Sequence, residues 1–459
     1  MSEPFLDFYR CPEDFGAFAL AGPLRAAPGY FRFGQDAVCY GQTSSGYCSS
    51  SPNDGLFDSF HNVAFNHSVR LPFDLSQVID NLRLERYLSR SNGSLADEVI
   101  RDWYYTIRPC LGIPARKRLQ KWFLRGWETI PFPQWPVDTT VERLFERLIA
   151  LALKSKSVDT IPFIWFWPEG ASSCLLMTHD VETERGAGFC SALMNIDDAW
   201  GFKASFQIVP EDRYRVSAQL LDSIRQRGFE LNVQDLNHDG RLFNDRTQFL
   251  ARAAAINRHL KRFGSRGFRS AVMYRNPDWL EALDISYDMS IPNSARLEPQ
   301  RGGCCTVFPY FIGQILEIPL TTVQDYSLFH ILNEYSIELW KRQIGLIQQQ
   351  HGLASFIIHP DYVVAGKACD TYLALLEYLG QLRKRANIWT ALPCEIDRWW
   401  RARAQMRLVM NQGRWIVEGP GSERACVAFA TLRGDEVEYS IEAPGRASTA
   451  CSVPLELAG

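Results

Sequence analysis

The sequence predicts an α/β protein whose central part is built from repeated β-α units, and three observations support this. Between about residues 166 and 400, short apolar runs alternate with stretches of helical periodicity, which is typical of a parallel sheet or barrel. The preceding region, 1–165, mixes an aromatic stretch containing Gly and Ser with helical patterns. After about residue 400, apolar and polar residues alternate between turns, which predicts a small β-rich module over 401–459.

Two helices are predicted in the N-terminal region. One carries apolar residues from Val78 to Leu84, and the other begins at Thr139, where Glu142 has the spacing of a capping box. Between them lies the basic amphipathic stretch Arg116–Arg125. Since no other basic cluster supports a membrane or nucleic-acid contact, we interpret it as a solvated helix face that carries its own core residues.

The central region contains five candidate strands. They are Cys174 to Thr178, Ala204 to Val209, Phe229 to Val233, Gly267 to Ser270, and Ser355 to Ile358. Helix boundaries between them support the pattern, with a glycine stop at Gly228 and an asparagine cap at Asn276 followed by proline. In the third strand apolar residues alternate with Glu230, Asn232 and Gln234, so one face of that strand is expected to be polar and accessible to solvent.

The composition restricts the partners. Hydrophobic residues make up 46% of the 459 residues and charged residues 22%, as in ordinary globular proteins. The net charge of -3 and pI near 6.3 give no reason to expect nucleic acid or an anionic membrane. The longest apolar run, Ile161–Trp167, is far below the ~20 residues that a bilayer requires, and we predict a buried strand there. Small or neutral substrates fit this net charge better than nucleic acid or an anionic membrane does.

The twelve cysteines are scattered and include no Cys-x-x-Cys pair, so a zinc site built from cysteines is not expected. The N-terminal sequence MSEPFLDFYR is acidic and aromatic, unlike a signal peptide. We therefore expect reduced thiols, many of them acting as small buried hydrophobes, and a cytoplasmic location.

Polar groups end or follow four of the candidate strands. They are Asp180 with Glu182, His238, Arg269 and His359. Because the carboxyl ends of parallel strands meet at one edge of a sheet, these side chains are expected to lie together. Extended backbone would point Asp180 and Glu182 to the same side, roughly 7 Å apart at two residue rises. Such a group suits hydrolysis, in which a divalent ion polarises a carbonyl, a carboxylate takes a proton from water and a histidine protonates the leaving group.

These residues resemble the polysaccharide deacetylases of the NodB-homology type, carbohydrate esterase family 4. The resemblance covers about residues 170 to 400 and rests on five motifs in the family's order. They are Thr178–Glu182, Asn237–Gly240, Gly267–Ser270, Ser286–Ser290 and Ile358–Pro360. It implies a distorted β/α barrel and metal-dependent removal of N- or O-acetyl groups from sugars. By this resemblance Asp180 matches the catalytic base, Arg269 the arginine that orients it, His238 a metal ligand and His359 the general acid.

The sequence also departs from the family pattern. The second aspartate of the first motif is replaced by Val181, so that only Glu182 could reach the ion, and the first histidine of the family's His-x-x-x-His pair is Gln234. The expected metal ligands are therefore Glu182, His238 and Gln234. Zinc is the first choice, with manganese or nickel as alternatives, and binding could be weakened or absent because an amide oxygen is a weak ligand for zinc. The fourth motif has no clear match, although Asp325 offers a buried acid.

Three functions remain open from the sequence. The first is deacetylation of an amino-sugar glycan or lipid-linked precursor, and the second is metal-independent hydrolysis of a cyclic amide on the same barrel, which Gln234 and Val181 favour. The third is glycan binding without catalysis, for which aromatic residues could stack on sugar rings: Tyr274, Trp279, Tyr326 and Trp399. The joint presence of Asp180, Arg269 and His359 favours an enzyme, since a binding protein needs no base, orienting arginine and acid together.

Overall fold

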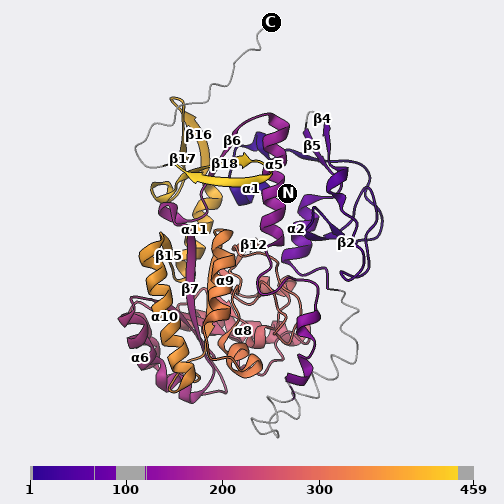
Figure 1. Cartoon of the computed structure of the whole chain (residues 1–459). Helices are drawn as coiled ribbons and strands as arrows, with labels where there is room; N and C mark the ends of the chain where they lie inside the picture. The colour runs from indigo at the N-terminus through magenta and orange to yellow at the C-terminus, as the bar shows by residue number, and fades with distance from the viewer. Residues whose placement is uncertain (1–3, 67, 89–118, 120, 443–459) are drawn as a thin grey trace.

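The computed structural model describes residues 4–66, 68–88, 119 and 121–442 (Figure 1). The basic stretch 116–125 lies partly outside these residues. In Figure 1 the helices α6, α8, α9 and α10 surround the strand β7 in the lower half, and the C-terminal strands lie above them. No described helix is long and apolar enough to cross a membrane. The ten cysteines in the described part are all free thiols.

The central sheet has nine strands and confirms the predicted α/β barrel fold. Only β12 runs antiparallel to its neighbour. In spatial order the strands are β12 (Tyr310–Ile312), β13 (Ile315–Glu317), β11 (Tyr287–Asp288), β10 (Gly267–Arg269), β9 (Glu230–Gln234), β8 (Ala204–Ile208), β7 (Ser173–Val181) and β14 (Leu353–Ile358), and β15 (Ile388–Thr390) pairs with the start of β7. All five predicted strands are present. β7 continues past the predicted end at Thr178, and all of its residues are buried.

The barrel is distorted where β14 meets the loop after β13. Here side chains connect the backbones: the Thr321 hydroxyl donates to Leu353 O at 2.7 Å, and the Thr322 hydroxyl donates to Ser355 O at 2.7 Å. The hydroxyl of Ser355 accepts a hydrogen bond from Thr321 N at 2.9 Å and donates to Pro319 O at 2.6 Å. Ser355 is therefore a closing point of the barrel.

Replacing Ser355 with alanine should lower the free energy of unfolding by about 2 kcal/mol, because a buried amide and a buried carbonyl lose their partner. Urea denaturation followed by circular dichroism would measure the change. Ser191→Ala, on an exposed face of α6, is the matched control and should stay within about 0.5 kcal/mol of the parent. Equal stability of the two variants would show that the side-chain closure contributes little.

Helices follow most strands of the barrel. They are α6 (Glu184–Ala199), α7 (Ala218–Gln226), α8 (Arg246–Phe263), α9 (Glu338–Gln349), α10 (Lys367–Arg385) and α11 (Pro393–Gln405). The predicted glycine stop after α7 is confirmed by Gly228, whose φ of +73° is in the left-handed region that favours glycine. The predicted cap is confirmed at Asn276, whose side chain accepts from Asp278 N at the start of η7 (Pro277–Ala282).

In the part of the N-terminal region that the structure describes, short strands are combined with three helices. Its elements are α1 (Pro4–Tyr9), β1 (Phe18–Leu20), β2 (Gly29–Arg32), β3 (Val38–Gly41), β4 (Ala64–Asn66), β5 (Ser68–Leu71), α2 (Leu75–Arg83) and α5 (Thr140–Lys156). The described residues also include short 3-10 helices at η1 (Glu13–Phe15), η2 (Ser59–Asn62), η4 (Trp127–Thr129), η5 (Pro168–Gly170), η6 (Ala271–Met273) and η9 (Ser422–Arg424), and a π-helix at η8 (Ser327–Leu332).

The predicted capping box before α5 is wrong. The side chain of Thr139 makes no capping hydrogen bond, and Thr140 N donates instead to Asp138 Oδ1 at 2.9 Å. The Glu142 carboxyl is directed to a barrel loop, where it accepts hydrogen bonds from the Thr306 hydroxyl and from Val307 N. Burial raises the pKa of Glu142 to about 8. A tertiary contact thus replaces the local cap.

The predicted β-rich C-terminal strands are present. They are β16 (Arg407–Asn411), β17 (Arg414–Glu418), β18 (Val427–Arg433) and β19 (Glu436–Ile441). β18 also pairs with β6 (Thr160–Ile164), which confirms a strand in the apolar run predicted to be buried. Arg403 connects α11 to β6 and to α1, since its guanidinium donates to the carbonyls of Ile164 and Phe8. Strands from both sides of the barrel sequence therefore share one sheet.

Candidate active site

Asp180 lies near the end of β7 with its carboxylate buried between two side chains. Its Oδ1 is 2.6 Å from Arg269 Nη1, and its Oδ2 accepts a hydrogen bond from Gln234 Nε2 at 3.2 Å. The residue is 3% exposed. Asp180 is thus held by side chains from two other strands of the barrel, β9 and β10.

Arg269, the last residue of β10, is fixed by contacts of its own. Its Nε donates to Met289 O at 3.1 Å, and Nη1 also donates to the Thr178 hydroxyl at 2.7 Å. Thr178 is two residues before Asp180 on the same face of β7, so one guanidinium bridges both. A buried charge pair with this many hydrogen bonds fixes the direction of its carboxylate, and loss of either partner would leave a buried charge uncompensated.

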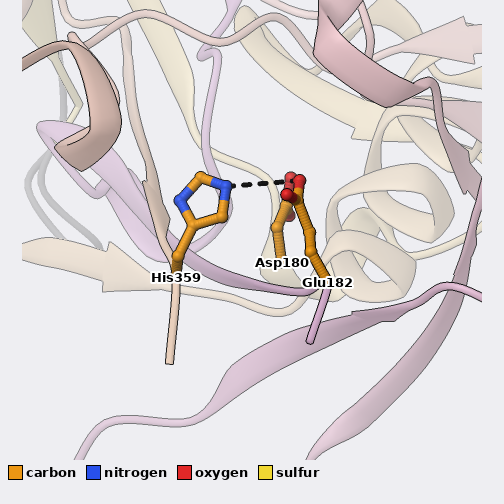
Figure 2. A group of neighbouring side chains, drawn as sticks. All are labelled: Asp180, Glu182 and His359. Atoms are coloured by element: carbon orange, nitrogen blue, oxygen red, sulfur yellow. Dashed lines mark ion pairs between the residues drawn. The ribbon is translucent and has the colours of Figure 1, made fainter. Parts of the chain in front are cut away.

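Glu182 follows β7 on the same side as Asp180, as the two-residue period predicts. Figure 2 shows both carboxylates converging with the His359 ring, and ligand atoms of these three residues all lie within 4.8 Å of one another. Glu182 Oε1 lies 2.7 Å from His238 Nε2 and 3.4 Å from His359 Nε2. Burial alone would raise the pKa of Glu182, but the two imidazoles outweigh it and hold this pKa well below its usual value.

His359 follows β14 and is paired with Asp325. The ring Nδ1 is 2.6 Å from Asp325 Oδ1, and the His359 backbone N–H donates to Asp325 Oδ2 at 2.7 Å. Burial alone would lower the pKa of His359, but Asp325 and Glu182 raise it well above its usual value. With Nδ1 bonded to Asp325, the other ring nitrogen is the one that faces Glu182. Asp325, which the sequence offered only as a buried acid, is therefore part of the site.

Gln234 and His238 complete the polar group. The Gln234 amide nitrogen donates to Asp180 and, at 3.0 Å, to Glu182 Oε1, while its Oε1 is buried without a hydrogen-bond partner in the described part of the chain. Both ring nitrogens of His238 are buried and likewise lack hydrogen bonds among the described residues. Although His238 Nε2 lies close to Glu182, the pair does not have hydrogen-bond geometry. Gln234 Oε1 and His238 Nδ1 therefore have no partner in the described structure, whereas His238 Nε2 is paired with Glu182.

The donor set fits a divalent ion. A carboxylate oxygen of Glu182, an imidazole nitrogen of His238 and an amide oxygen of Gln234 are groups of the kinds that bind divalent ions, and Gln234 Oε1 and His238 Nδ1 have no hydrogen-bond partner in the described structure. Asp235 and Asp361, both near these groups, each carry an unpartnered buried oxygen, and burial raises the pKa of both carboxyls. A cation would offset this accumulation of carboxylates.

Two residues of the motif Thr178–Glu182, His179 and Val181, point away from the site. His179 Nε2 lies 2.9 Å from Asp197 Oδ2, and Tyr372 donates to the same carboxylate from α10. Val181 is fully buried in the core. Alternate residues of β7 thus face opposite sides, so Val181 faces the core while Glu182, one residue further, faces the site.

Four of the thirteen described non-glycine residues with positive φ follow β9 and β10, the strands that carry Gln234 and Arg269. Asp235 and His238, in the loop after β9, have φ of 53° and 56°, and Val272 and Met273, in the loop after β10, have φ of 58° and 55°. A β-branched residue such as Val272 is especially unfavourable in the left-handed region. Strain of this kind is often found at functional sites, where the surrounding structure holds it in place.

The four aromatic residues proposed for sugar stacking lie in different surroundings. The indole of Trp399 is buried and donates to Phe166 O at 2.8 Å, and Trp279 packs 5.5 Å from the ring of Phe249. Tyr274 is half-buried. Tyr326 is the member close to the site, because it lies 6.1 Å from Tyr362, whose ring stacks on His359. The sequence did not indicate Tyr362.

No protein-family model and no curated protein matches the sequence. Solved structures do. One, described as a polysaccharide deacetylase from Mycobacterium smegmatis, has a TM-score of 0.42 and 17% identity over 52% of this chain and 93% of its own. An allantoinase gives 0.40 and 13% over 51% and 92%, and peptidoglycan deacetylase PdaC from Bacillus subtilis gives 0.32 and 9% over 49% and 90%. At these identities the function has to be judged from the site residues themselves.

Proposed function

We propose that this chain is a hydrolase that removes acetyl groups from an N- or O-acetylated sugar, in a glycan or a lipid-linked precursor. The observation that carries the proposal is the convergence of two buried pairs on Glu182: Asp180 with Arg269, and His359 with Asp325. Each pair consists of a group able to transfer a proton and a partner that orients it. A base and an acid on opposite sides of one site are what amide or ester hydrolysis requires.

In this proposal Asp180 takes the proton from the water that attacks the acetyl carbonyl carbon, while Arg269 keeps its carboxylate aimed at that water. The tetrahedral intermediate then collapses, and the bond to the sugar nitrogen or oxygen breaks. His359 gives the departing atom the proton it needs, with Asp325 holding Nδ1 so that Nε2 faces the reaction. Acetate and the free amine or hydroxyl are the products.

Glu182, His238 and Gln234 would hold the divalent ion, with zinc as the first choice and manganese or nickel as alternatives. A bound ion would supply Lewis-acid polarisation of the acetyl carbonyl. For this Gln234 has to present its oxygen, whereas its nitrogen now faces the two carboxylates. Because an amide oxygen suits hard ions, Gln234 would shift the preference away from zinc relative to a second histidine.

The hydrogen bonds of Gln234 also favour the second candidate, metal-independent hydrolysis of a cyclic amide. Its amide nitrogen bridges Asp180 and Glu182, so it holds the two carboxylates together as an ion otherwise would. The same base and acid would then open a ring amide, and both new groups would stay on one molecule. Glycan binding without turnover is the third candidate, and absence of hydrolysis on every substrate would favour it.

Metal content separates the first two candidates. We expect close to one divalent ion per purified chain, retained in His61→Ala, whose exposed histidine serves as control, and lost in His238→Ala, because an imidazole ligand is removed. Elemental analysis of the three proteins would measure this. In addition, Gln234→His should bind the ion roughly tenfold more tightly. A parent protein that contains no ion and takes up none when zinc, manganese or nickel is added would favour the metal-independent enzyme.

A further inference from the structure

A cavity of about 420 Å³ lies between the N-terminal region, the β12–β13 hairpin and α11. It is at the end of the barrel opposite the candidate active site. Gly313 and Gln314, which line the cavity, directly precede β13, a strand parallel to its neighbour β11, whereas Gln234 of the candidate site is the last residue of β9. The volume falls within the range of small-molecule sites. Nothing in the proposed hydrolysis uses this cavity.

Arg83, near the end of α2, is a cavity-lining cation that lies against two aromatic rings. Its guanidinium carbon lies 5.6 Å from the ring centre of Phe145 and 5.2 Å from that of Tyr310. Its Nε is buried without a hydrogen-bond partner in the described structure, and the acidic groups that interact with its charge are Asp80 and Glu142, whose pKa burial raises to about 8. Burial lowers the pKa of Arg83. The aromatic rings fix the plane of the guanidinium and leave its N–H groups for a ligand.

The other two arginines of the cavity are already committed to the protein. Arg403 donates to backbone carbonyls including that of Trp165 at 3.1 Å. Arg401 donates to Asp397 at 2.8 Å and to the carbonyls of Ser286 and Gln314. Their roles are structural, which distinguishes them from Arg83.

Asp80 lies one turn before Arg83 on α2 and lines the same cavity. Residues three apart on a helix are neighbours that commonly pair when their charges are opposite. Yet the described structure has no ion pair within 4 Å between Asp80 and Arg83, and it records no hydrogen bond for the Asp80 carboxylate. An acceptor and a guanidinium are therefore held apart, while the side chains of Tyr310 and Phe311 add apolar surface beside them.

We propose that this cavity binds a phosphorylated sugar. The guanidinium of Arg83 pairs with the phosphate, for which its planar fork of N–H groups is suited. The carboxylate of Asp80 accepts hydrogen bonds from sugar hydroxyls, and the face of the ring lies against the aromatic side chains of the hairpin. The cavity is a binding site, separate from the base and acid at the other end of the barrel, and the assignment does not depend on the proposed deacetylation.

Isothermal titration calorimetry with glucose 6-phosphate, glucose and inorganic phosphate tests this assignment. The parent should bind the phosphorylated sugar more tightly than either of the other two compounds. Arg83→Met should weaken that binding at least tenfold, whereas Arg258→Met, on the exposed face of α8, should leave it unchanged. Asp80→Asn should weaken binding of the phosphorylated sugar but not of inorganic phosphate, because only the sugar brings hydroxyls.

Circular dichroism and thermal melting establish that each variant is folded. If Arg83→Met does not fold, Arg83→Lys replaces it, since lysine keeps the charge but loses the fork, and weaker binding than the parent is still expected. No binding of glucose 6-phosphate by the folded parent, or equal affinity in the parent and the Arg83 variant, would overturn the proposal. Equal affinity for inorganic phosphate and glucose 6-phosphate would overturn the assignment of a sugar.

Discussion

Asp180→Asn is expected to lower the turnover of an acetylated sugar by about three orders of magnitude, within the range that a general base contributes. Asparagine has nearly the same shape and can still accept the hydrogen bond from Arg269, so the barrel should keep its structure. It cannot take a proton from water. Release of acetate from an acetylated amino-sugar oligomer measures turnover, and circular dichroism with thermal melting verifies the fold.

The matched control for this variant is Asp222→Asn. Asp222 lies on α7, pairs with Arg225 at the surface and has no contact with the site, so its turnover should equal that of the parent. Parental activity in Asp180→Asn would exclude Asp180 as the base. A variant that has lost both activity and its cooperative melting transition would instead indicate a structural role for the Asp180–Arg269 pair.

His359→Gln should also lower turnover, by about two to three orders of magnitude on an amide, but its effect should depend on the leaving group. An amine cannot depart without a proton, whereas the phenolate of an aryl acetate can. We therefore expect a much smaller loss on an aryl acetate than on an acetylated amino sugar. Parallel kinetics on both substrates measure the difference, and the Asp180→Asn variant should lose activity on both.

His61→Gln is the control for this comparison, because His61 is exposed and lies outside the site. Equal losses on the amide and on the aryl ester in His359→Gln would contradict a role as general acid. Such a result would favour a role for His359 in holding Glu182, which it approaches to 3.4 Å. The two variants together thus separate the step that activates water from the step that releases the sugar.

The sequence predicted much of the site because strand geometry is local. The two-residue period placed Asp180 and Glu182 on one side of β7, and their ligand atoms do converge. Because Arg269 and His359 end or follow strands, the sequence also predicted that they lie at the same edge of the sheet, and they contact Asp180 and Glu182 there. Neither inference needed to know which strands are neighbours, because all parallel strands of one barrel share an edge.

What the sequence did not settle depends on long-range contacts. The pairing of Asp325 with His359 joins a loop and a strand end that are 34 residues apart, and no local pattern marks it. The false capping box arose because Glu142 found partners in a barrel loop that compete with the cap of its own helix. In the same way, an apolar run such as Ile161–Trp167 predicts burial without saying which strand will cover it.

The pairing of β6 with β18 also determines the order in which this chain can finish folding. During synthesis, Thr160–Ile164 leaves the ribosome long before Val427–Arg433, and until then β6 presents unpaired backbone groups and apolar side chains at a sheet edge. β6 leads into β7, which carries Asp180, so the strand exposed during this interval directly precedes the strand of the proposed base. We therefore expect chaperones and proteases to act on a nascent or prematurely ended chain. Pairing of the last hairpin, β18–β19, with β6 should end the exposure of this edge.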